Sequence, residues 1–262
     1  MSTTKCQGCR GGDPLPFEFS MAFQPIIDAD TSGVWGYEAL VRGADGSGAA
    51  GILDQVDDAN RYKFDQACRV KAIELASALF PRSDDIRLSI NFMPNAVYEP
   101  SACIRATLDA AGRTGFPCKN ILFEFTENER MTDAGHVSRI IAEYRRHAFA
   151  TALDDFGAGY AGLNLLAAFQ PDFIKVDMEL IRGIDASVAR RAILASTLGL
   201  ARELGIEVIA EGVETVEEFT VLRGIGLKLF QGYLFAKPAF EALPAVVLPG
   251  SVGVALAGFR AA

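Results

Sequence analysis

Two hydrophobic runs near the N-terminus have the spacing of β-strands. Residues 17–25 alternate and then become continuously apolar, and residues 34–42 form a second run. The turn between them, residues 28–33, leaves too little chain for a crossover helix. We therefore expect the two runs to pair as an antiparallel hairpin.

Farther along the chain, short apolar runs alternate with stretches of helical periodicity. The predicted strands are residues 86–91, 121–126, 149–153, 172–177, 207–211 and 229–233, and the predicted helices are residues 59–79, 100–112, 133–147, 161–169, 186–204, 216–223 and 240–247. This pattern predicts an α/β fold, a TIM-like (β/α)8 barrel with one antiparallel strand. An open doubly wound sheet is the alternative, and it is disfavoured because no Gly-rich dinucleotide fingerprint follows the first strand.

The length and composition agree with a single large domain. The chain has 262 residues, of which 50% are hydrophobic, and no low-complexity segment or linker divides it. We expect a flexible N-terminal tail (residues 1–16), a barrel domain (17–250) and a C-terminal tail (251–262).

Charge and hydropathy limit the partners and the location. The chain carries 25 Lys and Arg against 33 Asp and Glu, and its basic residues never occur in runs longer than two. A nucleic-acid polymer is therefore not expected as a partner, whereas a small anionic substrate is compatible if a metal reverses the local field. No apolar stretch is long enough to span a bilayer and no signal-peptide core begins the chain, so we predict no membrane insertion and a cytoplasmic location.

The five cysteines fit free thiols in a reducing compartment better than a disulfide framework. Cys6 and Cys9 form a C-x-x-C in the N-terminal tail. The alternatives are half of a zinc site completed by a partner, a redox pair, or an unremarkable tail. Cys68, Cys103 and Cys118 look like packing or surface residues.

Polar side chains gather on or at the ends of the predicted strands. They are Glu38, Asn91, Glu124, Asp154, Asp155, Lys175, Asp177, Glu211 and Gln231, with Glu127 three residues beyond Glu124. Any one of them could be a solvated loop acid or a helix cap, and Lys175 could simply form a salt bridge with Asp177 or Asp155. Together they indicate an active site, because like charges are costly in proximity and barrel active sites form at one face of the strands.

Glu, Asp and Asn ligands without Cys or His select a hard cation such as Mg²⁺ or Mn²⁺ over Zn²⁺. His136 and His147 both lie on one predicted helix, which makes a histidine-based site hard to build. The acids outnumber the ligands of one ion, which indicates two metals about 3.5–4 Å apart, an arrangement typical of phosphate-ester cleavage. Lys175 could hold the attacking water or offset charge on the phosphoryl oxygens.

Seven short motifs carry a family resemblance. They are Tyr-Glu-Ala-Leu-Val-Arg (37–42), Ser-Ile-Asn (89–91), Glu-Phe-Thr-Glu (124–127), Asp-Asp-Phe-Gly-Ala-Gly-Tyr (154–160), Ile-Lys-Val-Asp (174–177), Ala-Glu-Gly-Val-Glu-Thr (210–215) and Gln-Gly-Tyr (231–233). In order and spacing the chain, from about residue 17 to residue 238, resembles the EAL domain, the bacterial cyclic di-GMP phosphodiesterase.

The resemblance implies a two-metal hydrolase that opens cyclic di-GMP to linear pGpG. The implied ligands of two Mg²⁺ or Mn²⁺ ions are Glu38, Asn91, Glu124, Asp154, Asp155 and Glu211. Lys175 would position the water, and Glu211 is the family's proposed general base, although a metal ligand is a poor free base. The implied substrate and supporting residues are Gln24, Leu40, Arg42, Asp177, Gln231 and Pro238, and the implied loop residues are Glu127, Glu214, Gly157 and Gly159.

Departures from the family pattern are few. Ala158 and Ala161 stand where relatives often have Thr and Ser, and Gly43 stands where Trp is common. By analogy a homodimer is expected, with regulation through the N-terminal tail, dimerisation or an unidentified regulatory protein, because no sensory or cyclase sequence is recognised. The competing hypotheses are a silent cyclic di-GMP receptor or protein-interaction module, and a metal-dependent barrel enzyme acting on another phosphate or an enolate.

Overall fold

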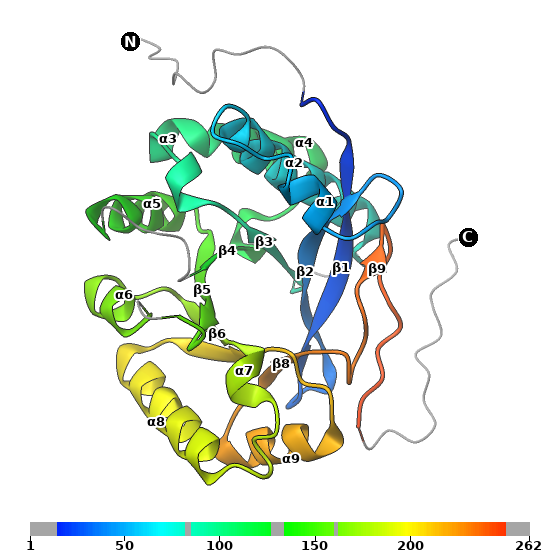
Figure 1. Cartoon of the computed structure of the whole chain (residues 1–262). Coiled ribbons are helices and arrows are strands. Elements are labelled where there is room, and N and C mark those ends of the chain that lie inside the picture. Colours follow the sequence, from blue (N-terminus) through cyan, green and yellow to red (C-terminus); the bar gives the residue numbers. More distant parts are fainter. Residues whose placement is uncertain (1–14, 82–84, 127–133, 160–161, 250–262) are drawn as a thin grey trace.

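The computed structural model describes residues 15–81, 85–126, 134–159 and 162–249 (Figure 1). Within these residues a sheet closes on itself. Its strands are β1 (Phe19–Asp28), β2 (Gly33–Gly43), β3 (Arg87–Asn91), β4 (Ile121–Thr126), β5 (Ala150–Phe156), β6 (Phe173–Val176), β7 (Glu207–Ala210) and β8 (Leu229–Gln231). Neighbours run from β2 through β8 to β1, and β1 also pairs with β2, which closes the barrel.

The predicted antiparallel strand is β1. It pairs antiparallel with β2 and with β8, whereas the pairs from β2–β3 to β7–β8 are parallel. The predicted TIM-like barrel with one reversed strand is confirmed, and closure excludes the open doubly wound sheet.

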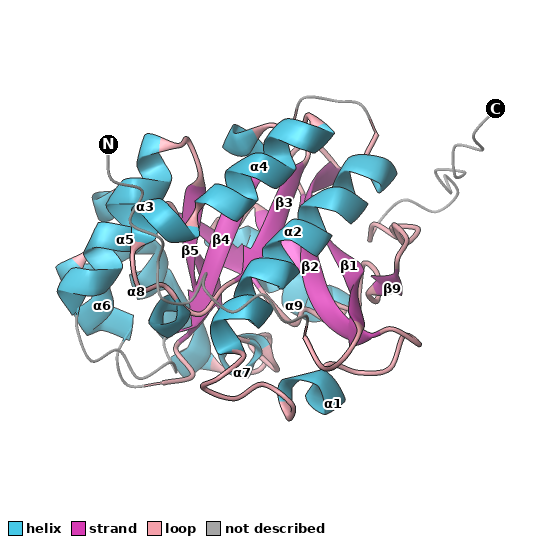
Figure 2. Cartoon of the chain, turned by 90° about the horizontal axis from the view of Figure 1, so that it is seen from above, coloured by secondary structure: helices cyan, strands magenta, loops and turns pink. Residues whose placement is uncertain are grey.

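Helices surround the barrel (Figure 2). The described ones are α1 (Ala50–Leu53), α2 (Arg61–Leu79), α3 (Pro100–Cys103), α4 (Arg105–Thr114), α5 (Ala134–Arg146), α6 (Gly162–Ala168), α7 (Met178–Ile181), α8 (Val188–Leu204) and α9 (Val216–Ile225), with short 3₁₀ turns η2 (Pro94–Ala96) and η3 (Cys118–Asn120). None of these helices is both long enough and apolar enough to cross a membrane.

The predicted helix over residues 240–247 is wrong. Ala239 and Phe240 form a short strand, β9, that pairs antiparallel with β1 outside the barrel. Glu241 then adopts a left-handed backbone (φ 47°), and Pro244 lacks the N–H that a helix needs. The apolar positions of this segment still pack: Leu243 lies against one apolar cluster and Val246 against another.

The predicted helix over residues 100–112 is divided in the structure. Ile104 separates α3 from α4, and α4 continues to Thr114, where Gly115 ends it with a left-handed backbone. Gly112, the predicted end, lies inside α4.

The barrel interior positions the site. One apolar cluster consists of Ile26, Leu122, Ala152, Phe173, Ile209 and Leu229, one from each of six strands. Residues two apart on a strand share a face. Two positions farther along the parallel strands lie Glu124, Asp154, Lys175 and Gln231, with Glu211 directly after β7, and two positions earlier on the reversed β1 lies Gln24. An apolar layer therefore supports a polar layer at one end of the barrel.

Candidate active site

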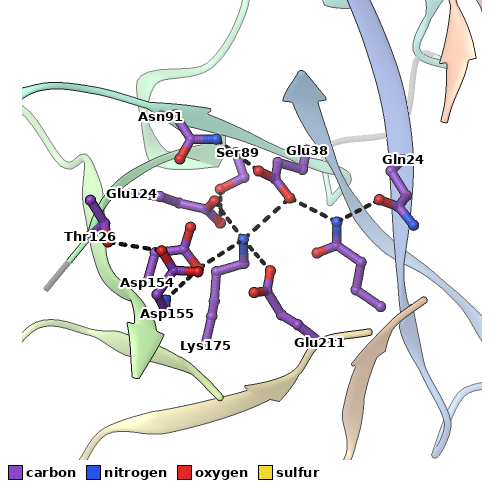
Figure 3. A network of polar contacts seen from close by, with 11 residues as sticks. Gln24, Glu38, Ser89, Asn91, Glu124, Thr126, Asp154, Asp155, Lys175 and Glu211 are labelled. Atoms are coloured by element: carbon purple, nitrogen blue, oxygen red, sulfur yellow. Dashed lines mark hydrogen bonds and ion pairs between the residues drawn. The ribbon is translucent and has the colours of Figure 1, made fainter. Parts of the chain in front are cut away.

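Lys175 on β6 lies at the centre of the polar layer (Figure 3). Its Nζ lies 2.7 Å from Glu124 Oε2, 2.5 Å from Glu211 Oε1, 3.2 Å from Glu38 Oε2 and 3.4 Å from Asp154 Oδ1. The sequence-based alternative, a pair with Asp177 or Asp155, is not what the structure shows. Four acids, on or just after four different strands, instead converge on one buried ammonium group.

Amide side chains hold Glu38 from the other side. Asn91 Nδ2 donates to Glu38 Oε1 over 2.7 Å, and Gln231 Nε2 donates to Glu38 Oε2 over 2.7 Å. The same Gln231 nitrogen lies 3.2 Å from Gln24 Oε1, and Gln24 Nε2 donates to the Ala236 carbonyl over 3.3 Å. Glu38 is thus fixed by partners from three other strands.

Asp154 and Asp155 reach the same site although they are neighbours in a strand. Adjacent strand residues normally point to opposite faces. The pairing of β5 with β6 is irregular between Leu153 and Phe156, and Asp155 has a left-handed backbone (φ 55°). As a result, oxygens of Asp154, Asp155 and Glu211 all lie within 4.8 Å of one another.

The acids differ in how well their charge is compensated. Burial raises the pKa of Glu124 well above its ordinary value, and Lys175 only partly offsets this. Burial, followed by the negative charge of Asp154, likewise raises the pKa of Glu211. The pKa of Asp154 is also raised, chiefly by burial and despite Lys175.

The charges of Glu38 and Lys175 are compensated by the groups around them. Burial acts to raise the pKa of Glu38, but Lys175 and the two amide donors together lower it below its ordinary value. Burial acts to lower the pKa of Lys175, and the surrounding acids, Asp154 first, outweigh it and raise that pKa well above the ordinary range. One ammonium group therefore satisfies part of the negative charge.

This donor set fits divalent cations. Five carboxylates and one amide present oxygen atoms, and the raised pKa values of Glu124, Asp154 and Glu211 show a site that favours further positive charge. Oxygen donors without Cys or His match Mg²⁺ or Mn²⁺. Glu124 and Lys175 are fully buried, whereas Asp154, Asp155 and Glu211 are half-buried and Asn91 is exposed, so the site opens toward solvent on the side of these last four.

The predicted substrate residues lie on different elements. Leu40 and Arg42 are half-buried on β2, and Arg42 Nη1 donates to the Val41 carbonyl over 2.7 Å. Pro238 is half-buried just before β9. Asp177 follows β6 and caps α7, where its Oδ1 accepts the Glu179 N–H over 2.8 Å.

The predicted loop residues are only partly described. Gly157 follows β5 with a φ of +98°, and Gly159 is half-buried in the same turn. Glu214 is exposed, and Arg182 Nη2 contacts its Oε1 at 2.8 Å. Glu127 lies outside the described residues, as do Cys6 and Cys9.

Two hydroxyl residues at the site had no predicted role. Ser89 donates a short hydrogen bond to Glu124 Oε1, and Thr126 Oγ1 donates to Asp155 Oδ2 over 2.9 Å. Ser89 lies two positions before Asn91, and Thr126 two positions after Glu124. The strand alternation that located the acids could have located these hydroxyls as well.

Comparison with known proteins decides the family. The EAL domain family model matches residues 17–238. The chain belongs to the EAL domain family.

Curated relatives have more than one described role. The chain is 33% identical over 228 residues to the blue light- and temperature-regulated antirepressor BluF of Escherichia coli K12, covering 87% of this chain and 56% of BluF. It is 30% identical over 226 residues to the cyclic di-GMP phosphodiesterase PA2567 of Pseudomonas aeruginosa, covering 84% of this chain and 38% of that protein. The chain thus spans about half or less of these two relatives.

Solved EAL structures confirm the fold. A standalone EAL protein of Vibrio cholerae O395, in its c-di-GMP-bound form, matches with a TM-score of 0.86 and 53% identity, covering 89% of this chain and 98% of that one. Klebsiella pneumoniae BlrP1, in a manganese and c-di-GMP complex, matches with a TM-score of 0.82 and 35% identity, covering 90% of this chain and 60% of that one.

Proposed function

We propose that this protein is a metal-dependent phosphodiesterase that hydrolyses cyclic di-GMP to linear pGpG and so lowers signalling by this second messenger. The observation that carries the proposal is the convergence of Glu38, Glu124, Asp154 and Glu211 on Lys175, with Asn91 and Asp155 beside them. A cyclic di-GMP phosphodiesterase among the relatives and c-di-GMP in the solved neighbours support the same substrate.

Two Mg²⁺ or Mn²⁺ ions are the proposed cofactors. Their proposed ligands are Glu38, Asn91, Glu124, Asp154, Asp155 and Glu211. When bound, the ions would supply Lewis-acid activation of water and neutralise charge on the phosphoryl oxygens. The manganese complex of BlrP1 supports this metal class.

The residues of the chain orient the reactants. Lys175 is proposed to hold the attacking water through its buried ammonium group, and Glu211 is the proposed proton acceptor. Attack in line forms a new P–O bond while the bond to the 3′ oxygen breaks, and the departing oxygen takes up a proton. The proposed substrate contacts are Gln24, Leu40, Arg42, Asp177, Gln231 and Pro238, with Arg42 on a phosphate.

Several features of the whole protein are proposed by analogy with the family. We propose a homodimer paired through helices beside the loop of Gly157 and Gly159, with Glu127 steadying that loop and Glu214 close to the site. A cytoplasmic location and an unidentified regulatory protein remain predictions from the sequence.

A turnover assay on matched variants tests the proposal. Glu38→Ala and Lys175→Ala are each expected to slow hydrolysis of cyclic di-GMP by at least about 100-fold in Mg²⁺ or Mn²⁺. Asp109→Asn, which alters an exposed acid on α4, is the control and should keep the wild-type rate. Hydrolysis by the Glu38→Ala protein at the wild-type rate would refute the assignment.

The alternative is a non-hydrolysing cyclic di-GMP receptor or protein-interaction module. It is favoured by the similarity to BluF, whose name describes an antirepressor. The two functions differ in a direct measurement: tight binding of cyclic di-GMP without turnover in Mg²⁺ or Mn²⁺ would establish the receptor.

A further inference from the structure

A second buried charge, Arg69 on α2, packs against Phe92, directly after β3, and Phe123 on β4. Arg69 on α2 is fully buried, and its Nη2 lies 2.7 Å from Oδ2 of buried Asp65, one helical turn earlier. Arg69 Nη1 donates to the Tyr144 hydroxyl over 2.6 Å. The guanidinium carbon lies 5.2 Å and 5.0 Å from the ring centres of Phe92 and Phe123.

Stability alone does not account for this cluster. The desolvation of a buried ion pair can cost more than its attraction returns, and apolar residues often replace one without loss. Burial raises the pKa of Asp65 even though Arg69 opposes the rise, whereas Asp65 and Tyr144 outweigh burial and raise the pKa of Arg69. Arg69 Nε finds no hydrogen-bond acceptor among the described residues.

The cluster contacts the backbone that carries two candidate metal ligands. Asp65 Oδ1 accepts the Met93 N–H over 2.9 Å, two residues after Asn91. Between them, Phe92 packs on Arg69 and donates its N–H to the Glu124 carbonyl over 2.9 Å. The segment after β3 is thus held on one side by α2 and on the other by β4.

We propose that Asp65 and Arg69 are positioning residues for the metal ligand Asn91. Asp65 fixes the backbone after β3 through Met93, and Arg69 fixes both Asp65 and the Phe92 ring. This constraint sets where the exposed Asn91 side chain meets Glu38. The inference rests on the proposed metal-dependent function. It gives two residues of α2 a role in that function.

A triple variant removes the constraint without leaving a buried charge unpaired. Asp65→Leu, Arg69→Met and Tyr144→Phe together replace the polar cluster by apolar groups, so the unfolding temperature should stay near that of wild type. The Met93 N–H loses its acceptor, so Mn²⁺ affinity, measured from free Mn²⁺ by electron paramagnetic resonance, should fall by about 10- to 100-fold.

The single variant Asp65→Asn should behave in the opposite way. Its amide oxygen can still accept the Met93 N–H, so Mn²⁺ affinity should equal that of wild type. Arg69 is left without its counter-charge, so the unfolding temperature should fall. The control, Glu74→Leu with Arg113→Met, removes an exposed ion pair between α2 and α4 and should leave both properties unchanged.

The triple variant and Asp65→Asn together distinguish a positioning role from a role in stability. The proposal is overturned if Mn²⁺ affinity follows unfolding temperature, with Asp65→Asn weaker than the triple variant, or if the triple variant binds Mn²⁺ as tightly as wild type. If wild type fails to hydrolyse cyclic di-GMP while the Mn²⁺ affinities behave as expected, the proposed function is wrong and the positioning role stands.

Discussion

Lys175 is a cation at the centre of a site built from acids. Four carboxylates lie within 3.4 Å of its Nζ, yet the pKa values of Glu124 and Glu211 remain well above the ordinary range. The ammonium group therefore allows these acids to lie close together in the folded protein. It compensates only part of their negative charge. The negative charge that Lys175 does not compensate would attract a divalent ion.

Replacement of the ammonium group separates catalysis from metal binding. In Lys175→Met, the proposed contact to the attacking water is lost, so kcat for cyclic di-GMP should fall by about 100-fold or more. Mn²⁺ affinity should be equal or higher, because a positive charge near the ligands has been removed. Steady-state kinetics and Mn²⁺ titration check this prediction, and a wild-type kcat would contradict the role of Lys175.

Metal binding should release protons. The folded-state pKa of Glu124 and of Glu211 is raised above the ordinary 4.5, so without metal these groups contribute stability that is present below pH 4.5 and lost as the pH rises through the raised pKa. Divalent ions displace the retained protons. The rise in unfolding temperature on adding Mg²⁺ should therefore be larger at about pH 8 than at about pH 5. A rise of equal size at both pH values would show that these acids bind metal without losing protons.

At the scale of elements, strand alternation explains what the sequence could predict. Two-residue spacing links Leu122 to Glu124 and Phe173 to Lys175, so apolar runs that end in polar residues revealed the barrel and its polar end together. Conformation outside the strands was harder to predict. The apolar spacing of residues 240–247 reflects burial against two clusters. The segment is irregular and contains Pro244, which disfavours a helix.

Pairings between distant elements could not be predicted from spacing. Arg182 forms an ion pair with Glu214, and Asp65 accepts a hydrogen bond from the Met93 N–H. The distance between the partners in each pair depends on how helices and loops pack around the barrel. The register irregularity that brings Asp155 to the same site as Asp154 also leaves no mark in the hydrophobic pattern.

The turn after β5 should be sensitive to a single methyl group. An added Cβ at Gly157 would lie 2.4 Å from Leu180 Cδ1, and its φ of +98° is unfavourable for other residues, so Gly157→Ala should cost about 1–2 kcal/mol of stability and lower kcat. Gly199→Ala within α8 meets nothing within 4 Å and should stabilise by about 0.5–1 kcal/mol. Urea unfolding of both proteins is the measurement, and equal stability of the two variants would argue against a constrained turn.

At the scale of the whole molecule, the closed barrel brings the polar ends of its strands together at one site. β1 pairs with both β2 and β8, so residues from the two ends of the barrel domain, such as Gln24 and Gln231, meet at one site. Regulation in this arrangement would act on the loops rather than on the strands.

The proposed dimer makes a prediction at this scale. If pairing through the helices beside the Gly157 loop is coupled to the site, kcat and Mn²⁺ affinity should rise with protein concentration across the monomer–dimer transition, which sedimentation velocity locates. Identical activity and metal affinity in the two forms would count against the coupling.

The proposed activity of this site is hydrolysis of cyclic di-GMP with a divalent metal. The most direct test is chromatographic product analysis after the purified protein is incubated with cyclic di-GMP, with Mg²⁺ and again with excess chelator. We expect linear pGpG in Mg²⁺ and unchanged cyclic di-GMP in chelator. Cyclic di-GMP that is bound but recovered intact in Mg²⁺ and in Mn²⁺ would contradict it.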